Sequence, residues 1–509
     1  MGGSQNRIRQ GILLSYFSMG LSVIVSLLYT PFLIKNLGQQ QYGLYNIAAS
    51  VIGYLSLFNF GLGTAVVRYS AKLRAENREN EIRSVYGLFI TIYSVLAGLV
   101  LVVGGILILF VENIFSISTG AEGYQQLRLI LAMMIVNLVI SFPASVYQSI
   151  ITSYERFAFL KGISIAITLV TPALMIPLLI MGYKAVMLTA IVQIIHIVAS
   201  AVYVFYVCCK LKIKIDFNFK ILEKSILKEI FTYSGFIFLG LIVDQLYWNT
   251  DKVILSVMIG EIPVAIYAVA SQIHSYYQQF SGSISEVFFP RVTRMVAEKQ
   301  GTDVLSELFI KIGRIQAHVM LLVLFGFVAF GQEFIGFWAG EGYEQAYWIA
   351  LLVVAPATIP LIESTGFLII KAMNKHKFRS ILYLIIAVVN VVLSVPACAY
   401  FGAIGCALCT CVCVIIGHGF IMNWFYWKKI KLAVPKFWAQ IARMALVGAP
   451  LSAFALFLNK ALPSPNFAVF AAKIAVFTTL YFLCQYAITM NAYEKSLISK
   501  AIKKVLRKS

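Results

Sequence analysis

Charged side chains are scarce in this sequence. Lys, Arg, Asp and Glu make up 12% of its 509 residues, whereas 60% are hydrophobic and the mean hydropathy is +0.86. Soluble globular chains carry about 25% charged and about 45–50% apolar residues. So few charges cannot cover a surface in contact with water, which excludes a water-soluble protein. The composition therefore predicts a polytopic membrane protein, most of which faces lipid.

Several motifs that carry chemistry are also missing. The sequence has no phosphate-binding loop of the GxxxxGK(S/T) type, so we expect no ATP hydrolysis by this chain. The eight cysteines lie in or beside apolar runs, which argues against a disulfide framework or a zinc ribbon. No His, Asp and Glu cluster has the spacing of metal ligands. We expect a protein that is not an enzyme and holds no cofactor, and nucleic acid is not an expected partner.

Apolar runs long enough to cross a membrane recur along the whole chain. About 20 helical residues cross a hydrocarbon core of ~30 Å, and a backbone in lipid must satisfy its own hydrogen bonds, which favours helices. The runs predict an all-α polytopic fold with about fourteen transmembrane helices. Their approximate bounds are 11–34, 44–67, 85–110, 126–151, 162–181, 185–209, 232–258, 264–288, 315–338, 346–370, 380–399, 403–425, 441–458 and 467–487.

Positive charge is distributed unevenly between the two predicted sides of the membrane. The chain carries 41 Lys and Arg against 21 Asp and Glu, a net charge of +20. In the connections after odd-numbered spans the only basic residues are Lys35, Lys184 and Lys460, and most of the others lie at the two ends and in the even-numbered connections. Short basic connections remain in the cytoplasm. We therefore expect both termini in the cytoplasm and an anionic inner leaflet facing the basic side.

The sequence contains an internal repeat. LGQQQYGLYNIA (37–48), after the first span, corresponds to IGEIPVAIYAVA (259–270), after the seventh, at an offset of 222 residues. A weaker match pairs ITSYERF (151–157) with AMNKHKF (372–378), after spans four and ten. An even number of spans separates the copies, so both run in the same direction through the membrane. Parallel repeats of this kind are one way to build a two-lobed transporter.

Four segments carry a family resemblance. They are LGQQQYGLYNIAAS (37–50), FNFGLGTAVVRYS (58–70), YQSIITSYERF (147–157) and DKVILSVMIGEIPVAIYAVASQI (251–273). In their order and spacing they resemble the conserved stretches of bacterial polysaccharide-biosynthesis flippases. These are the Wzx-type O-antigen and oligosaccharide exporters of the multidrug/oligosaccharidyl-lipid/polysaccharide (MOP) superfamily. The resemblance covers roughly the first twelve spans.

The resemblance implies a MOP/MATE-like architecture of two pseudo-symmetric six-helix lobes around a central cavity that works by alternating access. Residues 1–209 would form the N-terminal lobe and 210–231 a cytoplasmic linker. Residues 232–425 would form the C-terminal lobe, followed over 426–509 by a further helix pair and a basic cytoplasmic tail.

The resemblance also implies a substrate and partners. The protein would move undecaprenyl-diphosphate-linked O-antigen or polysaccharide repeat units from the cytoplasmic to the periplasmic leaflet of the bacterial inner membrane. Its partners would be this glycolipid, the bilayer, and the polysaccharide polymerase and chain-length proteins of the same pathway. The energy source stays open among coupling to H⁺ or Na⁺, the substrate gradient and the membrane potential. Two alternatives stay open: an ion-coupled multidrug exporter of the same superfamily, and a flippase for the lipid precursor of peptidoglycan. A polymerase-type enzyme is disfavoured because the longest outer connection, 111–125, is short.

Acidic residues inside a predicted span are candidate functional residues, because a charge there costs about 2.5–3.5 kcal/mol on insertion scales. Asp244, Trp248 and Asp251 follow one another at i, i+4 and i+7 in the seventh span, which places them on one helical face. We predict a site for a coupling ion, a proton or sugar hydroxyls on this face. The alternative is that Asp251 lies near the outer interface and only fixes the topology.

A polar stripe in the eighth span is the second candidate. Its members, at i, i+4, i+7 and i+11, are Tyr267, Ser271, His274 and Gln278. Such a face cannot point at lipid, and aromatic and amide groups suit sugars. His274 is either a proton carrier or a structural histidine, and His196 in the sixth span is interpreted as structural. Asn46 and Tyr54 form a thinner stripe in the second span.

Two arginines are candidates for binding a diphosphate. Arg68 ends the second span and Arg291 ends the eighth, at nearly equivalent positions of the repeat. The planar guanidinium group binds phosphate oxygens through paired hydrogen bonds. Both residues lie at the predicted cytoplasmic side, where a substrate would load. The alternative is that they only anchor the topology.

Overall fold

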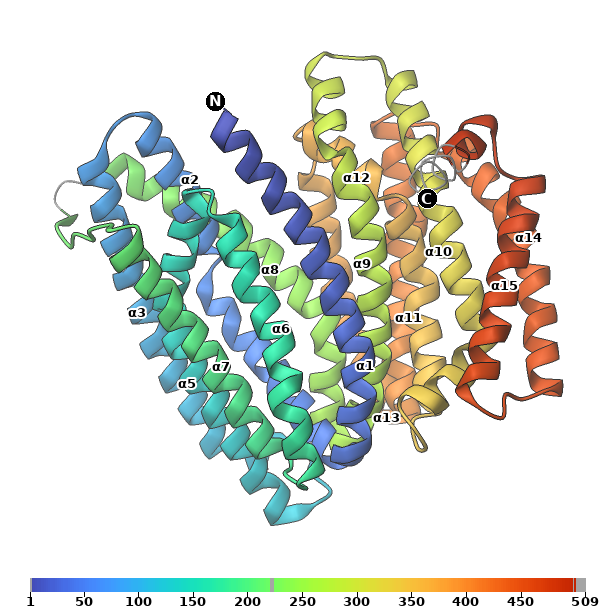
Figure 1. The fold of residues 1–509 in the computed structure, drawn as a ribbon, viewed down its shortest axis with the longest axis horizontal. Helices are drawn as coiled ribbons and strands as arrows, with labels where there is room; N and C mark the ends of the chain where they lie inside the picture. Colours follow the sequence, from blue (N-terminus) through green and yellow to red (C-terminus); the bar gives the residue numbers. More distant parts are fainter. Residues whose placement is uncertain (1, 220–223, 498, 500–509) are drawn as a thin grey trace. The chain divides into compact units, whose positions relative to one another are not determined.

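The computed structural model describes the backbone of residues 2–219, 224–497 and 499. In this part of the chain every regular element is a helix (Figure 1). The first elements are α1 (Gly2–Leu55), η1 (Ser56–Asn59), α2 (Leu62–Ala75), α3 (Glu79–Leu109), α4 (Val111–Ile114), α5 (Gly120–Ser153), α6 (Phe157–Ile180), α7 (Ala185–Phe205), η2 (Tyr206–Lys210) and α8 (Lys224–Met258). They are followed by α9 (Glu261–Ala297), α10 (Thr302–Trp338), α11 (Gln345–Ile362), α12 (Ser364–Ala372), α13 (Lys377–Val414), η4 (Ile415–Met422), η5 (Phe425–Lys429), α14 (Val434–Ala461) and α15 (Phe467–Ile488).

Ten segments of the described chain are long and apolar enough to cross a membrane. Two of these segments are double, because Leu14–Ala75 holds the predicted first and second spans and Lys377–Lys429 holds the eleventh and twelfth. The seventh and eighth predicted spans fall on α8 and α9, two long helices that are not among the ten. Together these helices correspond to the fourteen predicted spans, and the predicted all-helical polytopic fold is confirmed.

Glycines separate the paired spans inside α1 and α13. Gly38 has a φ of 71° and a ψ of 171°, and Gly402 has a φ of 59° and a ψ of −139°. Positive φ values are costly for residues with a Cβ and accessible to glycine. Each glycine therefore lets the chain turn between one span and the next without a long loop.

The second predicted span is broken in its middle. The helical path of α1 ends in η1, and Phe60 and Gly61 adopt left-handed backbone angles before α2 begins. A Cβ at Gly61 would come within 2.3 Å of the Ile237 side chain of α8, so this position also requires glycine. The amide of Gly61 donates to the Asn59 Oδ1 at 2.6 Å, which compensates in part for the interrupted helix. The prediction of a continuous helix over 44–67 was therefore wrong.

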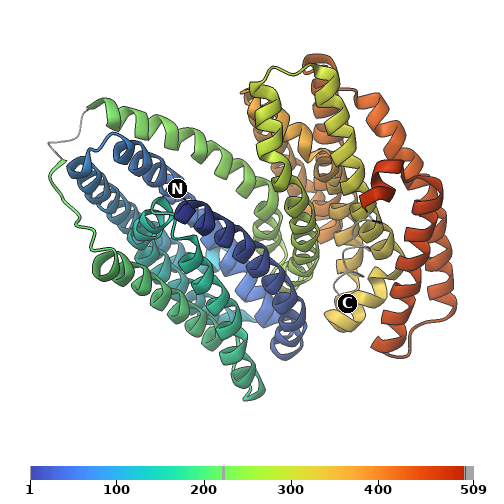
Figure 2. The same cartoon turned by 45° about the horizontal axis from the view of Figure 1, so that its top comes forward.

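The described chain divides into two compact units. Residues 1–268 with 398–403 form the N-terminal unit, and residues 269–397 with 404–509 form the C-terminal unit. α8 belongs to the first of these by its packing, since it runs beside α1 and α2 (Figure 2). The predicted lobes, which follow the repeat, instead place α8 in the C-terminal lobe, and these repeat boundaries remain a prediction. Parts of the predicted linker (220–223) and basic tail (498 and 500–509) lie outside the described residues.

α5 is the central helix of the N-terminal unit. It packs against α1, α2, α3, α6 and α7. Tyr93 of α3 meets Phe142 of α5 in an edge-to-face contact with ring centroids 5.8 Å apart, and Tyr93 is almost completely buried. Burying aromatic rings of this size contributes strongly to helix packing. The position of α5 determines which of its side chains pack against neighbouring helices in the core and which can face a cavity.

α10 has the corresponding role in the C-terminal unit, where it packs against α11, α12, α14 and α15 (Figure 1). A buried ion pair ties it to the chain beyond α15. The Arg314 guanidinium donates to both carboxylate oxygens of Glu494 at 2.7 Å and to the Thr489 carbonyl at 2.7 Å. His318 lies 3.4 Å from the same carboxylate. These contacts fasten the C-terminal helix pair to α10.

Replacing Glu494 by Gln should destabilise the protein at neutral pH by about 3–5 kcal/mol, because the buried Arg314 loses its counter-charge. Burial alone raises the pKa of the Glu494 carboxyl, but hydrogen bonds from Arg314 and His318 outweigh it and lower the pKa from 4.5 to about 2. Because the pKa of this carboxyl is lower in the folded than in the unfolded protein, its ionised form stabilises the fold at pH values above the unfolded-state pKa. This stabilisation is lost as the pH falls through the folded-state pKa. The difference between wild type and variant should therefore shrink between about pH 4.5 and pH 2.

Unfolding in detergent, followed by tryptophan fluorescence, measures this difference. Glu341→Gln, at an exposed loop position, is the matched control and should match the wild type. A Glu494→Gln variant as stable as this control at pH 7 would contradict the assignment.

Candidate functional site

The structure brings two of the predicted site residues together. Asp251, on α8, is 4% exposed, and its carboxylate accepts a hydrogen bond from the Tyr267 hydroxyl on α9. Both residues belong to the N-terminal unit. A buried carboxylate is stable only with such donors, so this pair is satisfied by protein groups.

The other members of the α8 and α1 stripes have different surroundings. Asp244 is exposed, whereas Trp248 is half-buried and packs edge-on against Tyr247 with centroids 4.7 Å apart. The Tyr54 hydroxyl is hydrogen-bonded to that of Thr250, which connects α1 with α8. The Asn46 amide donates to the backbone carbonyl one turn earlier, at 2.8 Å. The roles predicted for these residues stay predictions.

The remaining predicted residues also differ in exposure. On α9, in the C-terminal unit, His274 is buried, Ser271 is half-buried and Gln278 is exposed. The exposed Arg68 guanidinium lies over the Tyr233 ring at 4.5 Å, an interaction within the N-terminal unit. Arg291 is exposed at its position on α9. No single cluster gathers these residues within either unit.

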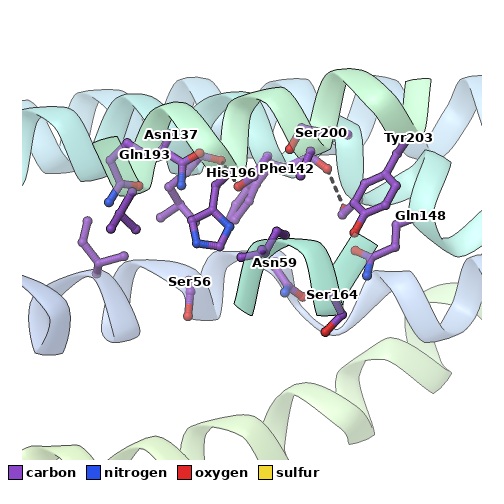
Figure 3. A pocket seen from close by; sticks show the side chains of 18 of the residues that line it. Ser56, Asn59, Asn137, Phe142, Gln148, Ser164, Gln193, His196, Ser200 and Tyr203 are labelled. Carbon is purple, nitrogen blue, oxygen red and sulfur yellow. Dashed lines mark hydrogen bonds between the residues drawn. The ribbon is translucent and has the colours of Figure 1, made fainter. Parts of the chain in front are cut away.

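A polar cavity lies inside the N-terminal unit instead. It has a volume of about 940 Å³ and is lined by residues of α1, η1, α5, α6 and α7 (Figure 3). This volume is at the upper end of the range of small-molecule sites. The lining is polar although all of these helices are predicted to cross the membrane. Polar side chains inside a span that do not face lipid are candidates for substrate contact.

Helical spacing places the polar side chains on the cavity wall. On α5 they recur every three or four residues, at Asn137, Ser141, Ser145, Gln148 and Thr152. On α7 they do so at Gln193, His196, Ser200 and Tyr203, and on α6 at Lys161, Ser164 and Thr168. Residues at this spacing share one face of a helix. The opposite faces carry the apolar residues that meet lipid or neighbouring helices.

The break in the second span completes the cavity. Ser56 and Asn59 of η1 line the cavity opposite the α7 side chains (Figure 3). In a continuous α-helix, Ser56 and Asn59 would follow the regular helical turn. η1 and the left-handed residue after it change the course of the backbone, and both residues line the cavity. Broken helices in membrane transporters commonly mark binding sites, because irregular backbone is tolerated at membrane depth only beside a cavity or protein.

Part of the hydrogen-bonding capacity of the cavity wall is unused. The hydroxyls of Ser56, Ser141, Ser145, Thr152 and Thr168 donate to backbone carbonyls, whereas several amide, imidazole and phenol groups have no partner. In the described part of the chain, no hydrogen bond or ion pair involves the side chains of Gln148, Lys161, Gln193, His196 or Tyr203. The Asn137 Oδ1 is buried and also has no partner. A buried polar atom without a partner costs about 1–3 kcal/mol. These groups are therefore available to a ligand, and they do not stabilise the fold.

The only sign of permanent charge in the lining of the cavity is positive. Lys161 is the one residue of the lining with a permanent charge, and the lining contains no Asp or Glu. A site for an organic cation or a metal ion would need carboxylates or similar anionic ligands. Among the described residues, no group of three His, Cys, Asp or Glu side chains is placed to hold a metal ion.

Polar side chains in the C-terminal unit are arranged differently. The Gln316 amide of α10 donates to the hydroxyls of Ser285 (2.6 Å) and Ser364 (2.9 Å), and the Ser364 hydroxyl donates back to the Gln316 carbonyl oxygen at 3.0 Å. Gln316 is completely buried. The polar groups of this network satisfy one another's hydrogen bonds, which indicates a structural role.

The C-terminal unit also contains an apolar cavity of about 330 Å³. α9, α10 and α15 supply most of its lining, with one residue from α11. Aromatic side chains dominate it, namely Tyr276, Tyr277, Phe280, Phe327, Phe330, Phe334, Phe470 and Phe477. Four of its lining residues, Phe470, Ile474, Phe477 and Thr478, come from α15, so the second helix of the C-terminal pair helps to build this apolar site.

Comparison with known proteins decides the family. A model of the family described as polysaccharide biosynthesis protein matches residues 8–296, more than half of the chain. The chain belongs to the polysaccharide biosynthesis protein family. The resemblance to Wzx-type members of the MOP superfamily is thereby confirmed.

Individual relatives agree with this family. A Shigella flexneri protein described as a candidate O-antigen transporter is 21% identical over 430 residues, which cover 82% of this chain and 97% of that protein. Among solved structures, the inward closed lipid II flippase MurJ matches with a TM-score of 0.72 and 16% identity, covering 96% of this chain and 99% of MurJ. An inward-facing MATE family multidrug transporter matches with a TM-score of 0.62 and 14% identity, and the match covers 82% of this chain and 95% of the transporter. These similarities confirm the MOP-like fold.

Sequence reasoning missed most of the cavity. It searched for charges and for stripes in spans seven and eight, and it interpreted His196 as structural. The structure places His196 in the cavity wall, without a protein partner. The available signal was the recurrence of uncharged amides and hydroxyls every three or four residues in α5 and α7. Weighting neutral polar residues by helical spacing would have found both faces.

The unused polar groups lead to a prediction about stability. Replacing Asn137 by Leu should stabilise the protein by about 1–3 kcal/mol, since a buried amide oxygen without a partner is removed and no protein hydrogen bond is lost. Asn390→Leu is the matched comparison, because the Asn390 amide donates to the Thr410 hydroxyl at 3.2 Å and its carbonyl oxygen accepts from Ser394 at 3.4 Å. It should cost about 1–3 kcal/mol. Unfolding of both variants in the same detergent provides the measurement, and an equal loss in both would show that Asn137 has a structural role.

Proposed function

We propose that this protein is a lipid-linked oligosaccharide flippase. It moves polyprenyl-diphosphate-linked repeat units, with undecaprenyl as the lipid, from the cytoplasmic to the outer leaflet by alternating access. The observation that carries this proposal is the polar cavity of the N-terminal unit, where the Gln148 and Gln193 amides and the Tyr203 hydroxyl have no partner among the described residues and the lining contains no carboxylate. Such a wall can exchange the hydration of sugar hydroxyls for protein hydrogen bonds as the glycan crosses the membrane.

The lipid part of the substrate has a matching site. A polyprenyl chain is apolar and flexible, and the cavity formed mainly by α9, α10 and α15 is lined almost entirely by aromatic and aliphatic side chains. Part of such a chain can exchange its contacts with lipid for van der Waals contacts with this lining.

The relatives support the same substrate class. The Shigella flexneri relative is described by O-antigen transport, and MurJ by flipping of lipid II. The MurJ match includes the C-terminal helices that build the apolar cavity, since it covers 96% of this chain. Transport and not catalysis is the activity that this family and fold support.

Further parts of the proposal rest on the distribution of charge along the chain and on the two aspartates of α8. The basic even-numbered connections support cytoplasmic termini in a bacterial inner membrane. Arg68 and Arg291 would meet the diphosphate at the loading side, and Asp244 and Asp251 would serve a proton or sodium ion that drives the cycle. The polysaccharide polymerase and chain-length proteins of the pathway would receive the product.

Flipping can be tested directly in proteoliposomes that contain a polyprenyl-diphosphate oligosaccharide, with a lectin outside to detect molecules that have crossed. Wild type should move the glycolipid, and Arg68→Gln should slow it about tenfold, as expected for one lost charge-assisted hydrogen bond. Asp244→Asn should remove the response to an imposed proton or sodium gradient. Arg443→Gln, an exposed arginine of α14, is the matched control and should flip normally.

Two further substrates in the same vesicles test the alternatives. Transport of a small organic cation without any glycolipid movement would overturn the proposal in favour of a multidrug exporter. Transport of lipid II but of no other glycolipid would assign the protein to the peptidoglycan pathway.

A further inference from the structure

The cavity of the N-terminal unit presents its polar groups as an extended wall. Asn137 and Gln148 on α5 are eleven residues apart, and Gln193 and Tyr203 on α7 are ten apart, which corresponds to roughly 15 Å along each helix. Both stretches line the same cavity (Figure 3). A wall of this length is suited to a chain of sugar rings more than to a compact drug-like molecule.

The groups on this wall are suited to discrimination between glycans. Amides such as Gln148 and Gln193 both donate and accept, so they can recognise the direction of individual hydroxyls. The hydroxyl of Tyr203 and the ring of Phe142 add a hydrogen bond and an apolar face. A site built to hydrogen-bond a hydroxyl strongly rejects an analogue without it, because the protein groups are then left unpaired.

Lys161 adds a preference for negative charge. Lys161 lines the cavity, and its side chain makes no ion pair or hydrogen bond with a described residue. The described lining has no carboxylate that could neutralise it. An unpaired lysine beside neutral hydrogen-bonding groups favours a ligand that combines hydroxyls with an anion, and it disfavours a cation.

We infer that this cavity is the glycan-binding subsite of the flippase. In it the α5 and α7 amides form hydrogen bonds with sugar hydroxyls, and Lys161 pairs with an anionic group of the same substrate. The inference rests on the proposed function and names the site within it. The anion is a phosphate of the lipid linker or a carboxylate of an acidic sugar. Both give the same chemistry at Lys161, and the experiment below distinguishes them.

The test is glycan binding by the full-length protein in nanodiscs, without lipid-linked substrate. An immobilised panel of bacterial oligosaccharides, with neutral and uronic-acid-containing members in matched pairs, provides the probes, and inorganic diphosphate is added as competitor. Gln193→Leu and Gln148→Leu should weaken binding of neutral and acidic members alike by about tenfold. Lys161→Gln should leave the neutral members unchanged and remove the preference for their acidic partners.

Matched controls distinguish these effects from a general loss of structure. Gln345→Leu and Lys436→Gln replace exposed residues of the same types, on α11 and α14 of the C-terminal unit, and should bind like the wild type. Each variant is first checked for a wild-type unfolding temperature in detergent. A variant that fails this check is replaced by the milder Gln193→Asn or Lys161→Arg. The first shortens the reach of the amide, and the second should keep the acidic preference.

The outcomes separate the two sources of the anion. Competition by diphosphate that depends on Lys161 assigns the lysine to the lipid linker, and an acidic preference that diphosphate does not reduce assigns it to the sugar. Either result supports the inference. Absence of binding to every panel member, or binding that none of the three cavity variants changes, would overturn it.

The panel needs neither a lipid anchor nor transport, so its result is separate from that of the flipping assay. Glycolipid movement that is unaffected by the cavity variants would refute the subsite and leave the flippase standing. Glycan binding without glycolipid movement would refute the flippase instead.

Discussion

A backbone that crosses a membrane must satisfy its hydrogen bonds internally, and most features of this structure depend on that constraint. It explains why every regular element of the described chain is a helix. It also explains where irregular backbone occurs. Gly38 and Gly402 turn the chain between two spans, and the break at η1 lies beside a polar cavity. Irregular backbone within a span is thus found where protein groups accept or donate the lost helical hydrogen bonds, or where the backbone lies beside a cavity.

The same constraint gives meaning to polar side chains within the spans. Two solutions are present in this protein. In the C-terminal unit, Gln316 and its serine partners satisfy one another, and Arg314 is matched by Glu494. In the N-terminal unit, the α5 and α7 amides face a cavity with their hydrogen-bonding capacity unused. The first arrangement stabilises a fold, whereas the second costs stability and is understandable as part of a binding site.

Sequence alone was sufficient for the helical fold class, the approximate spans and the family, because apolar run length and the segments 37–50 and 251–273 are local signals. It was not sufficient for the site. The cavity depends on which face of α5 and α7 is covered by neighbouring helices, and this is a property of packing and not of any one span. The break at Ser56–Asn59 was missed because its residues are apolar enough to continue the predicted helix. Asp251 attracted attention as a charge, but the structure shows it bonded to Tyr267 within the protein.

The central claim is that the polar cavity of the N-terminal unit receives the glycan of a lipid-linked substrate. It is tested most directly by photo-crosslinking with a polyprenyl-diphosphate oligosaccharide that carries the reactive group on a sugar, followed by peptide mapping. The account predicts that the sugar probe labels α5, α6 and α7 around the polar cavity. Labelling of other helices without any labelling of α5 and α7 would contradict it.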